Sequence, residues 1–407
     1  MSLLSVSAAF AHVGRSVLPS ARIEHIPLAH GRGRVLASPV LADRAYPPYD
    51  RVMMDGVCFS SASLVTGRAF TLAGTLHAGE CTPPPALALG QAWRINTGAA
   101  LPADCDCVVP VEELALTDER AAIITDFQPQ PYQFVHRCGS DTAAGATVLP
   151  AGTILDSAAL SIAVSVGALE LSVIAHPRVF ILTTGQEAIP PDQQPSATQI
   201  RRSHPTALTS ALQHLGITDI THVHLPDDYQ RMQNTLTDAI QRADLILTCG
   251  AISKGSSDYL GTILTELCGV PAFHGVAQRP GKPLAYWPAT TPDTPHIFAL
   301  PGNALSTLIT FHRYVRPAIS TLLGHRTDQP GTAPHTAPTT VTVAHQLPDF
   351  HLTRFLPVRL TAPGHAQLLS PQNSGDFSAL AGSQGFIELS AGTPPASPAL
   401  LPFYPWL

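Results

Sequence analysis

The sequence predicts a multi-domain chain of the α/β plus β class, with a central parallel sheet and smaller β domains. From Arg178 onward, short apolar runs alternate with helical patterns, which is typical of a parallel sheet with helices on both faces. Between residues 70 and 148, and again from residue 340, short β segments separated by Gly and Pro turns predict β domains. A length of 407 residues exceeds one ordinary core and supports two to four domains.

The composition is that of a globular protein with few charged side chains. Hydrophobic residues make up 45% of the chain, charged residues 13%, and the formal net charge is −6. With no long basic run, nucleic acid is not an expected partner. The seven cysteines are scattered without a metal-type pair, which favours reduced thiols in the cytoplasm. No apolar run approaches the ~20 residues of a membrane span, so we expect no membrane partner.

The N-terminal segments are expected to form a helix followed by extended chain. Ser5–Leu18 is amphipathic and lacks the basic start of a signal peptide, so it predicts a helix. Arg22–Ala29 and Arg34–Leu41 are expected to be extended, and the Pro-rich Tyr46–Asp50 marks a domain crossing. A second helix at Leu155–Val166 is expected to rejoin the N-terminal segment.

The second half of the chain alternates strands and helices before a small β domain. The predicted strands are Val179–Leu182, His222–Leu225, Asp244–Thr248 and His296–Leu300. The predicted helices are His204–Leu215, Tyr229–Arg242, Tyr259–Leu267 and Leu305–Leu323. The composition of Thr327–Thr339 predicts a linker, and a β segment at Phe386–Leu389 belongs to the last domain.

Three turns in this half contain Gly and polar residues in the arrangement that binds anions. They span 248–258, 279–283 and 300–306, and Arg279 and Lys282 add positive charge. Each turn alone could be an ordinary loop, but three in succession favour a phosphate or oxyanion site. Acidic side chains also follow strands in this half, where ligands of such sheets bind. These residues are Glu187, Asp227 and Asp258.

Seven motifs, in order along the chain, resemble the molybdopterin molybdenumtransferases, which are related to the E domain of gephyrin. The resemblance extends from the helix at Ser5 to Leu389. The motifs are Met54-Asp55-Gly56, Asn96-Thr97-Gly98-Ala99 with Pro102, Val108-Val109 with Glu112, Thr184-Gly185 with Glu187, Asp258-Tyr259, Arg279-Pro280-Gly281-Lys282-Pro283 and Leu300-Pro301-Gly302-Asn303.

The resemblance implies four domains and a homodimer. Residues 1–50 and 146–176 would form a composite N-terminal dimerisation domain, with an inserted β domain at 51–145. An α/β molybdopterin-binding domain would span 177–327, and a C-terminal β-barrel 328–407. The implied active cleft lies between the α/β domain of one subunit and the inserted domain of the other. Other molybdenum cofactor biosynthesis proteins and apo-molybdoenzymes are further candidate partners.

The implied reaction takes adenylylated molybdopterin (molybdopterin-AMP) and molybdate, inserts molybdenum at the dithiolene, and releases AMP with Mg²⁺ present. Because Mg²⁺ prefers oxygen ligands, Glu187, Asp227 and Asp258 are the candidate metal ligands and catalytic residues. Asp55, Thr97 and Asp141 match catalytic positions that act from the neighbouring subunit. The expected substrate-binding residues are Gly250, Ser253, Gly255, Ser256, Arg279, Gly281, Lys282, Pro301, Gly302, Asn303, Ser306, Arg354 and Ser374.

Several of these residues have simpler structural explanations. Asp55 could be a turn aspartate, and Asp227 or Asp258 could cap the helix that follows it. Thr97 could be a strand threonine, and Ser306 a serine in the first turn of a helix.

Molybdate is expected to contact Lys282, Arg279 and Ser306, with Arg354 and Ser374 completing the site.

The chain also departs from the family pattern in ways that make the expected pocket more basic. Arg201 and Arg202 are candidates to supply a positive charge that the family places near Gly275. The substitutions are Arg279 for Lys, Gly275 for Lys, Arg202-Ser203-His204 for Asp-(Ser/Thr)-Asn, Gln186 for Asp and Ser256 for Glu. Two alternatives to molybdate insertion therefore stay open: a molybdopterin-binding or scaffolding paralogue without turnover, and a tungstate-inserting variant.

Overall fold

The protein is represented by a computed structural model that describes residues 3–80, 82–250, 259–325, 339–344, 347, 350–369, 371, 373, 375–392 and 396–406. Contacts divide the chain into two compact units. Unit 1 comprises Met1–Ile26, Gly33–Ala37 and Ser172–Leu407, and unit 2 comprises Pro27–Arg32 and Ser38–Leu171.

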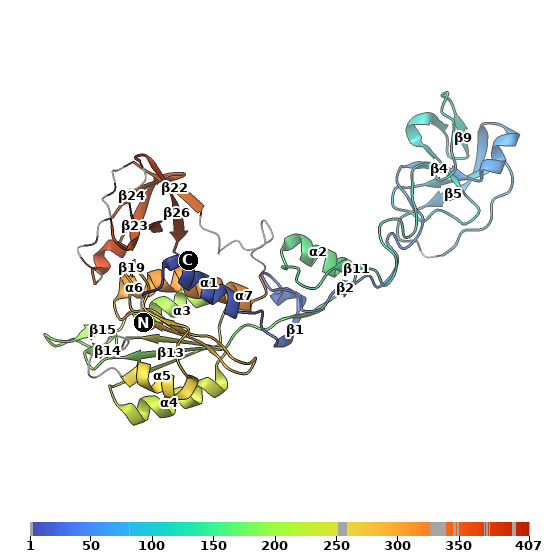
Figure 1. The fold of residues 1–407 in the computed structure, drawn as a ribbon. Helices are drawn as coiled ribbons and strands as arrows, with labels where there is room; N and C mark the ends of the chain where they lie inside the picture. Colours follow the sequence, from blue (N-terminus) through green and yellow to red (C-terminus); the bar gives the residue numbers. More distant parts are fainter. Residues whose placement is uncertain are drawn as a thin grey trace. The chain divides into compact units, whose positions relative to one another are not determined.

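A six-stranded sheet forms the centre of unit 1 (Figure 1). Its order is β16 (Ile220–Leu225), β13 (Val179–Thr184), β17 (Leu245–Cys249), β21 (His296–Leu300), β20 (Ala285–Trp287) and β18 (Phe273–His274). The first four strands are parallel, as predicted, and β20 and β18 add an antiparallel edge. These two strands were not predicted, because two or three residues are too few to show a hydrophobic period.

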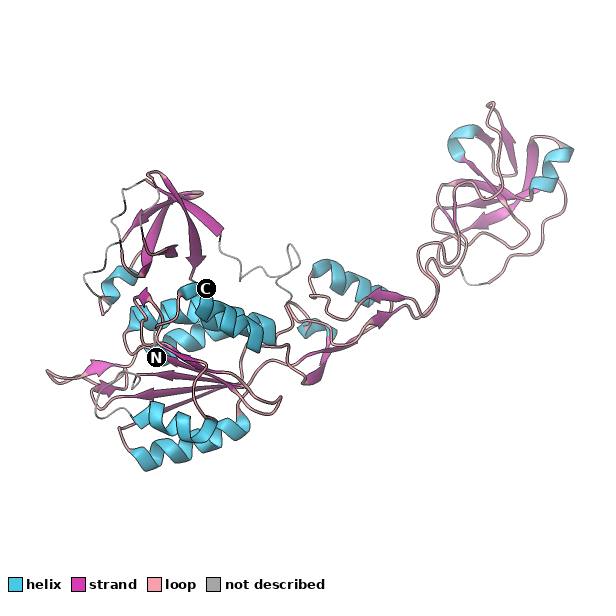
Figure 2. Ribbon diagram, viewed as in Figure 1, coloured by secondary structure: helices cyan, strands magenta, loops and turns pink. Residues whose placement is uncertain are grey.

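Helices cover both faces of this sheet, which confirms the prediction (Figure 2). One face packs against α1 (Val6–Ser16), α3 (His204–His214), α6 (Ala304–Thr310) and α7 (Arg316–Leu322). The other face packs against α4 (Tyr229–Arg242) and α5 (Tyr259–Cys268). In α4 the buried Met232, Leu236 and Ala239 recur every three or four residues, so they form one apolar stripe facing the sheet.

The helix predicted at Leu305–Leu323 is interrupted by one π-helical turn. Helix α6 is followed by the turn η4 (Phe311–Val315) and then by α7. Pro317 stands in the first turn of α7 and has no backbone N–H to donate to the carbonyl of Arg313. The missing donor explains why the regular helical ladder is not continued through this turn.

Five strands close into a small barrel in the C-terminal part of unit 1. Around the ring these are β23 (Thr353–Ala362), β24 (His365–Leu368), β22 (Thr339–Val343), β26 (Ala399–Pro405) and β25 (Gly385–Leu389), which pairs again with β23. A strand from the α/β part, β19 (Gln278–Arg279), pairs with β23. The predicted C-terminal β-barrel is therefore confirmed, and it is joined directly to the α/β part.

Smaller elements complete unit 1. The short strands β14 (Ala188–Ile189) and β15 (Ile200–Arg201) pair beside the main sheet, and η5 (Phe377–Leu380) is a 3-10 turn of the barrel segment. Strands β1 (Ile23–Pro27) and β12 (Glu170–Ile174) form a two-stranded sheet where the chain passes between the units.

Unit 2 contains a second six-stranded sheet, which is the predicted inserted β domain. Residues of β4 alternate between the two cores on its faces, with Val57 and Phe59 in one and Cys58 in the other. The strand order is β7 (Cys107–Pro110), β4 (Gly56–Phe59), β6 (Gln91–Ile95), β5 (Ala69–Leu76), β9 (Arg120–Ile123) and β8 (Leu114–Leu116).

The rest of unit 2 consists of one helix, two small strand pairs and short 3-10 turns. Helix α2 (Ser157–Ser165) begins at Asp156, whose side chain accepts a hydrogen bond from the Ala159 N–H at 2.8 Å. The pairs are β3 (Arg51–Val52) with β10 (Val135–His136), and β2 (Val40–Leu41) with β11 (Thr147–Leu149). The turns are η1 (Leu28–His30), η2 (Ser61–Thr66) and η3 (Val111–Glu113).

The predicted fold class is confirmed by these elements, while the four predicted domain boundaries stay a prediction. Helix α1 packs in the same core as the central sheet, through Val6, Ala9 and Val13. Among the helices within the described residues, none is long and apolar enough to cross a membrane.

Candidate functional site

A large cavity opens at the carboxyl ends of β13 and β17. The chain runs from β13 to β16 on one side and returns to β17 on the other, so the strand order reverses between β13 and β17. In open α/β sheets this reversal is where ligands bind, because the loops that follow the two strands diverge. The cavity has a volume of about 1060 Å³. That volume is sufficient for a ligand larger than a single nucleotide base.

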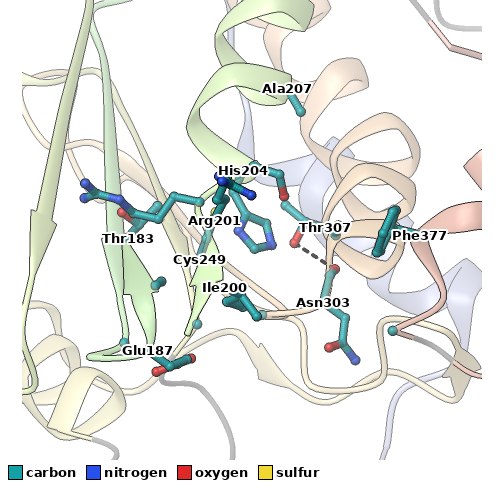
Figure 3. Close-up of a pocket in the computed structure, with 18 of the residues that line it drawn as sticks. Thr183, Glu187, Ile200, Arg201, His204, Ala207, Cys249, Asn303, Thr307 and Phe377 are labelled. Carbon is teal, nitrogen blue, oxygen red and sulfur yellow. Dashed lines mark hydrogen bonds between the residues drawn. The ribbon is translucent and has the colours of Figure 1, made fainter. Parts of the chain in front are cut away.

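The cavity has a polar side and an apolar side. Thr183, Glu187 and Asp227 contribute polar groups from the loops and strand ends. Leu308 of α6 and Phe377 of the barrel segment contribute apolar surface. Figure 3 shows Glu187 and Phe377 on opposite sides of the cavity. An elongated ligand with a charged part and an apolar or aromatic part would match this division.

Glu187 and Asp227 line the same cavity, as the positions after their strands predicted. Helix α4 is capped by Asp228, whose carboxylate accepts a hydrogen bond from the Arg231 N–H at 2.8 Å. The alternative that Asp227 caps this helix is therefore wrong, and its carboxylate is left to the cavity. Two carboxylates suit Mg²⁺, which is often held by one or two carboxylates together with waters and substrate phosphates.

The third predicted metal ligand, Asp258, lies outside the described residues, as do Ser253, Gly255, Ser256 and Ser374. Within the described part of the chain, there is no group of three or more His, Cys, Asp or Glu side chains arranged to hold a metal. The oxygen donors present, Glu187 and Asp227, fit a magnesium ion that takes its other ligands from water and substrate.

The predicted turn at residues 300–306 forms the floor between the strand ends. The Gly250 N–H donates to the Leu300 carbonyl at 3.4 Å, and a Cβ on Gly302 would lie 3.4 Å from the Gly250 Cα. The Thr307 hydroxyl donates to the carbonyls of Pro301 and Asn303 and so holds the turn. Of the predicted residues, Gly250, Gly302 and Asn303 line the cavity, whereas Pro301 and Ser306 are buried beside it.

His204, at the start of α3, also lines this cavity. Burial lowers the pKa of its imidazole, although a hydrogen bond with the Gly302 backbone opposes that shift. Its Nε2 is buried without a hydrogen-bond partner among the described residues. In Figure 3 the ring is directed toward the interior of the cavity. A neutral imidazole is therefore the form expected at this position near neutral pH.

A second, smaller cavity of about 190 Å³ lies between the α/β part and the barrel. Arg279 of β19 and Arg354 of β23 both line it, and they are direct partners in the pairing of the two strands. Burial, together with the charge of Arg279, lowers the pKa of Arg354, and the Arg354 guanidinium lies 4.3 Å from the ring centroid of Phe350. Two arginines held side by side repel each other, and a bound anion would relieve that repulsion.

The turn that carries Arg279 is fixed by a buried glutamine. The Gln278 side-chain amide donates to the carbonyls of Pro280 and Gly281, each at 3.2 Å, and its carbonyl oxygen accepts from the Tyr314 hydroxyl. Gly281 has a φ of +90°, and a Cβ there would lie 2.6 Å from both Gln278 and Thr310 atoms. The turn therefore requires glycine. Lys282, which follows, is exposed and lines neither cavity.

In unit 2 the structure brings Asp55 and Thr97 together. The Asp55 carboxylate accepts a hydrogen bond from the Thr97 N–H at 2.6 Å, and this bond is the main cause that lowers the pKa of Asp55. Asp55 thus organises the turn at Thr97, which is consistent with its alternative role as a turn aspartate. Asp55 is exposed to solvent, so its carboxylate can accept further hydrogen bonds.

Asp141 is held by a different set of partners in unit 2. The His136 Nε2 lies 2.6 Å from the Asp141 carboxylate, and the His136 Nδ1 lies 3.1 Å from the Arg51 guanidinium. Because arginine can only donate, Nδ1 accepts and Nε2 carries the proton given to Asp141. This hydrogen bond lowers the pKa of Asp141. Its carboxylate is therefore oriented and ionised at neutral pH.

Several cavity residues were not among those predicted from the sequence. Thr183, Arg201, Arg202, His204, Thr307 and Phe377 line the large cavity. Arg201 and Arg202 were expected to supply positive charge to the pocket, although they were not among the expected binding residues, and His204 was noted as a departure from a family motif. Phe377 had no signal, because its position in the cavity depends on how the barrel segment folds back.

Comparison with known proteins agrees with this architecture. Residues 4–167 match the family model described as "MoeA N-terminal region (domain I and II)", and residues 180–321 match the "Probable molybdopterin binding domain". The chain is 37% identical over 381 residues to a molybdopterin molybdenumtransferase from Synechocystis sp., covering 92% of this chain and 93% of that relative. It is 28% identical to a molybdopterin molybdenumtransferase from Haemophilus influenzae, covering 74% of each.

Among solved structures, a molybdopterin biosynthesis MoeA protein from Pyrococcus horikoshii matches all of both chains with a TM-score of 0.82 at 24% identity. That likeness shows the fold. Together with the sequence relatives, the matched regions establish the class as enzymes of molybdenum cofactor synthesis. The chain belongs to the molybdopterin molybdenumtransferase family.

Proposed function

We propose that this chain transfers molybdenum from molybdate to adenylylated molybdopterin and releases AMP. The observation that supports this most strongly is the presence of two unlike cavities in unit 1. The large one has carboxylates and an apolar wall, and the small one has two arginines. A large bipartite substrate and a small oxyanion are the two reactants that such cavities would take.

Two chain segments contribute lining residues to both cavities, so the cavities lie close to each other. Asn303 and Ala304 line the large cavity, and the next residue, Leu305, lines the small one. Likewise Asn373 lines the small cavity and Gly375 the large one. An oxyanion at Arg279 and Arg354 would therefore be held beside a ligand that fills the large cavity. Such proximity is what a transfer between two bound reactants requires.

The protein groups have separable tasks in this reaction. Glu187 and Asp227 would hold Mg²⁺, with Asp258 as a further candidate. A bound Mg²⁺ would neutralise charge on the phosphate oxygens as AMP leaves. Arg279 and Arg354 would bind and orient molybdate through charge-assisted hydrogen bonds. The turns at Gly250 and Gly302 allow a ligand to approach the backbone closely, since they present no side chain.

Dimerisation and a cytoplasmic location belong to the same proposal. Asp55, Thr97 and Asp141 lie in unit 2, and we propose that they act on the substrate bound by the neighbouring subunit of a homodimer. Their support is the match of their motifs to the family together with the carboxylate orientation described above. A monomer in solution with full turnover would contradict this arrangement.

The activity is tested by incubating the purified full chain with adenylylated molybdopterin, Mg²⁺ and molybdate, and following AMP by chromatography. We expect AMP release that depends on both molybdate and Mg²⁺. Binding of adenylylated molybdopterin without any AMP release under these conditions would contradict a transferase and favour a binding protein. The named relatives favour the transferase, since both of those described above carry that name.

A further inference from the structure

Two adjacent arginines, Arg201 and Arg202, line the large cavity but differ in their partners. Arg201 is exposed, and its guanidinium donates to the Pro191 carbonyl at 3.1 Å and to the Gln194 side chain at 3.4 Å. Arg202 is partly buried. Its guanidinium makes no side-chain hydrogen bond and no ion pair within 4.0 Å among the residues that the structure describes.

His222 and His224, whose pKa values respond to the charge of Arg202, cannot serve as its counter-ion. The Thr183 hydroxyl, which lines the cavity, lies 3.0 Å from both the His222 Nε2 and the His224 Nδ1. Burial and the nearby charge of Arg202 lower the pKa of both imidazoles. The two histidines are thus neutral near neutral pH, and Arg202 supplies the positive charge of this cluster.

Carboxylates lie in the same cavity but do not neutralise Arg202. Glu187 and Asp227 raise the pKa of His224, whereas Arg202 lowers it. Groups of both charges therefore lie near this imidazole. Neither carboxylate comes within 4.0 Å of a basic side chain among the described residues. A partly desolvated guanidinium facing a cavity that also contains separated carboxylates leaves room for a ligand between them.

We propose that Arg202 binds a phosphate group of the ligand in the large cavity, which Glu187 and Asp227 also line. The guanidinium fork gives two parallel donors to phosphate oxygens, which recovers the hydration lost on partial burial. The Thr183 hydroxyl, fixed between its two histidines, forms the wall beside that phosphate. This inference deepens the proposed function and rests on it, because the phosphate belongs to the AMP part of the substrate.

The test is calorimetric titration of the full chain with AMP and with adenosine, which lacks the phosphate. We expect Arg202→Gln to weaken AMP binding by about 10- to 100-fold, the range of a charge-assisted hydrogen bond, and to leave adenosine binding within about twofold. Arg202→Lys should fall between wild type and Arg202→Gln, because it keeps the charge but loses the planar fork.

Two matched variants separate a specific contact from a loss of charge. Arg201→Gln makes the same change of net charge at the neighbouring residue and should cost less than about threefold, since its guanidinium is already engaged and exposed. Arg242→Gln, at the exposed end of α4, should bind AMP as wild type does.

Different results would contradict the role of Arg202 and the proposed transfer reaction. Wild-type protein that binds AMP and releases it in the transfer reaction, with an Arg202→Gln variant equal to it in AMP affinity, would overturn the role of Arg202 alone. Equal weakening of AMP and adenosine by Arg202→Gln would also overturn it, because a phosphate contact cannot affect adenosine. Wild-type protein that shows no AMP release with adenylylated molybdopterin would overturn the proposed function itself.

Discussion

The two cavities of unit 1 use charge in opposite ways. The large cavity, of about 1060 Å³, is lined by both carboxylates and arginines. The small cavity brings two arginines together around about 190 Å³, with no carboxylate among its lining residues in the described part of the chain. Mixed charge suits a phosphate ligand that brings a metal with it, whereas paired cations suit a compact anion. The contrast predicts that each cavity can be impaired without impairing the other.

The difference also follows from how each cavity is built. Loops at the ends of parallel strands surround the large one, so its polar groups come from several separate segments. The small one depends on a single strand pairing, Arg279 with Arg354, between the α/β part and the barrel. Its geometry therefore depends on the docking of the barrel.

The largest effect is expected where the barrel is attached to the α/β part. The mostly buried Arg313 donates to Glu388 of β25 at 2.8 Å, and the Tyr404 hydroxyl donates to the same carboxylate at 2.8 Å. Glu388→Gln would leave Arg313 buried without its counter-ion, which should lower the free energy of unfolding by about 3 kcal/mol. Urea unfolding measures this change.

An Arg313→Met, Glu388→Gln double variant serves as the control for that prediction. Removing both charges should restore part of the stability, because no uncompensated charge is left buried. If the single variant stays within about 0.5 kcal/mol of wild type, well below the cost of breaking a buried pair, this ion pair does not hold the barrel.

The next effect isolates the small cavity. Arg354→Gln should raise the molybdate concentration at half-maximal rate by about 10- to 100-fold, because one of two charge-assisted contacts is lost. AMP affinity should stay near the wild-type value. Arg354→Lys should lie between the two, since lysine cannot make the bidentate contact. An unchanged molybdate dependence would remove Arg354 from the oxyanion site, and a loss of AMP affinity would show that the cavities are not separable.

A smaller effect isolates the metal side of the large cavity. Combining Glu187→Gln with Asp227→Asn should raise the Mg²⁺ concentration needed for half-maximal AMP release by roughly tenfold, because Mg²⁺ loses two carboxylate ligands. Asp228→Asn is the control at the neighbouring residue, since asparagine caps a helix as well as aspartate does. It removes one negative charge beside the cavity, where the double variant removes two. Equal Mg²⁺ dependence in all three proteins would exclude a metal role for the pair.

The smallest expected effect is on the stability of the fold. The dependence of the reaction rate on either substrate should not change. His312 lines neither cavity, and burial, helped by Arg316, lowers its pKa to about 3 from an ordinary value of 6.5. Between pH 6.5 and 3 the unfolded chain binds a proton that the folded chain does not, so stability falls as pH falls through this window. From pH 8 to pH 6 His312 alone should account for a loss of about 1 kcal/mol, and His176 and His296, whose pKa values burial lowers to about 4, add losses of the same sign.

Replacing His312 by leucine should reduce the loss of stability between pH 8 and pH 6 by about 1 kcal/mol, which is the contribution of His312. The variant also eliminates a buried Nδ1 that has no partner among the described residues. Thermal unfolding at pH 8 and pH 6 measures the difference. A variant whose stability declines with pH as steeply as that of wild type would show that another group causes the decline.

Much of the fold was predictable because its elements carry strong periodic patterns. Helix α4 and strand β21 have the predicted bounds, since each is a regular amphipathic or apolar run. Short edge strands such as β18 were not predictable, and neither was the π turn before α7, because pairing and backbone geometry there depend on tertiary contacts.

The candidate site was predictable to the extent that its residues lie in local motifs. Glu187, Asp227, Gly302 and Asn303 line the large cavity because each follows a strand whose end faces it. Arg354 meets Arg279 because β19 pairs with β23 across a long sequence separation, a contact that no local pattern reveals. The exposure of Lys282 and the burial of Ser306 likewise depend on packing.

The most direct test of molybdenum transfer is a single-turnover measurement with the full chain. Protein loaded with adenylylated molybdopterin is mixed with Mg²⁺ and molybdate, and both released AMP and dithiolene-bound molybdenum are quantified over time. The account predicts that the two products appear together in a one-to-one ratio and at the same rate. AMP released without incorporation of molybdenum, or molybdenum bound while the adenylate stays intact, would contradict it.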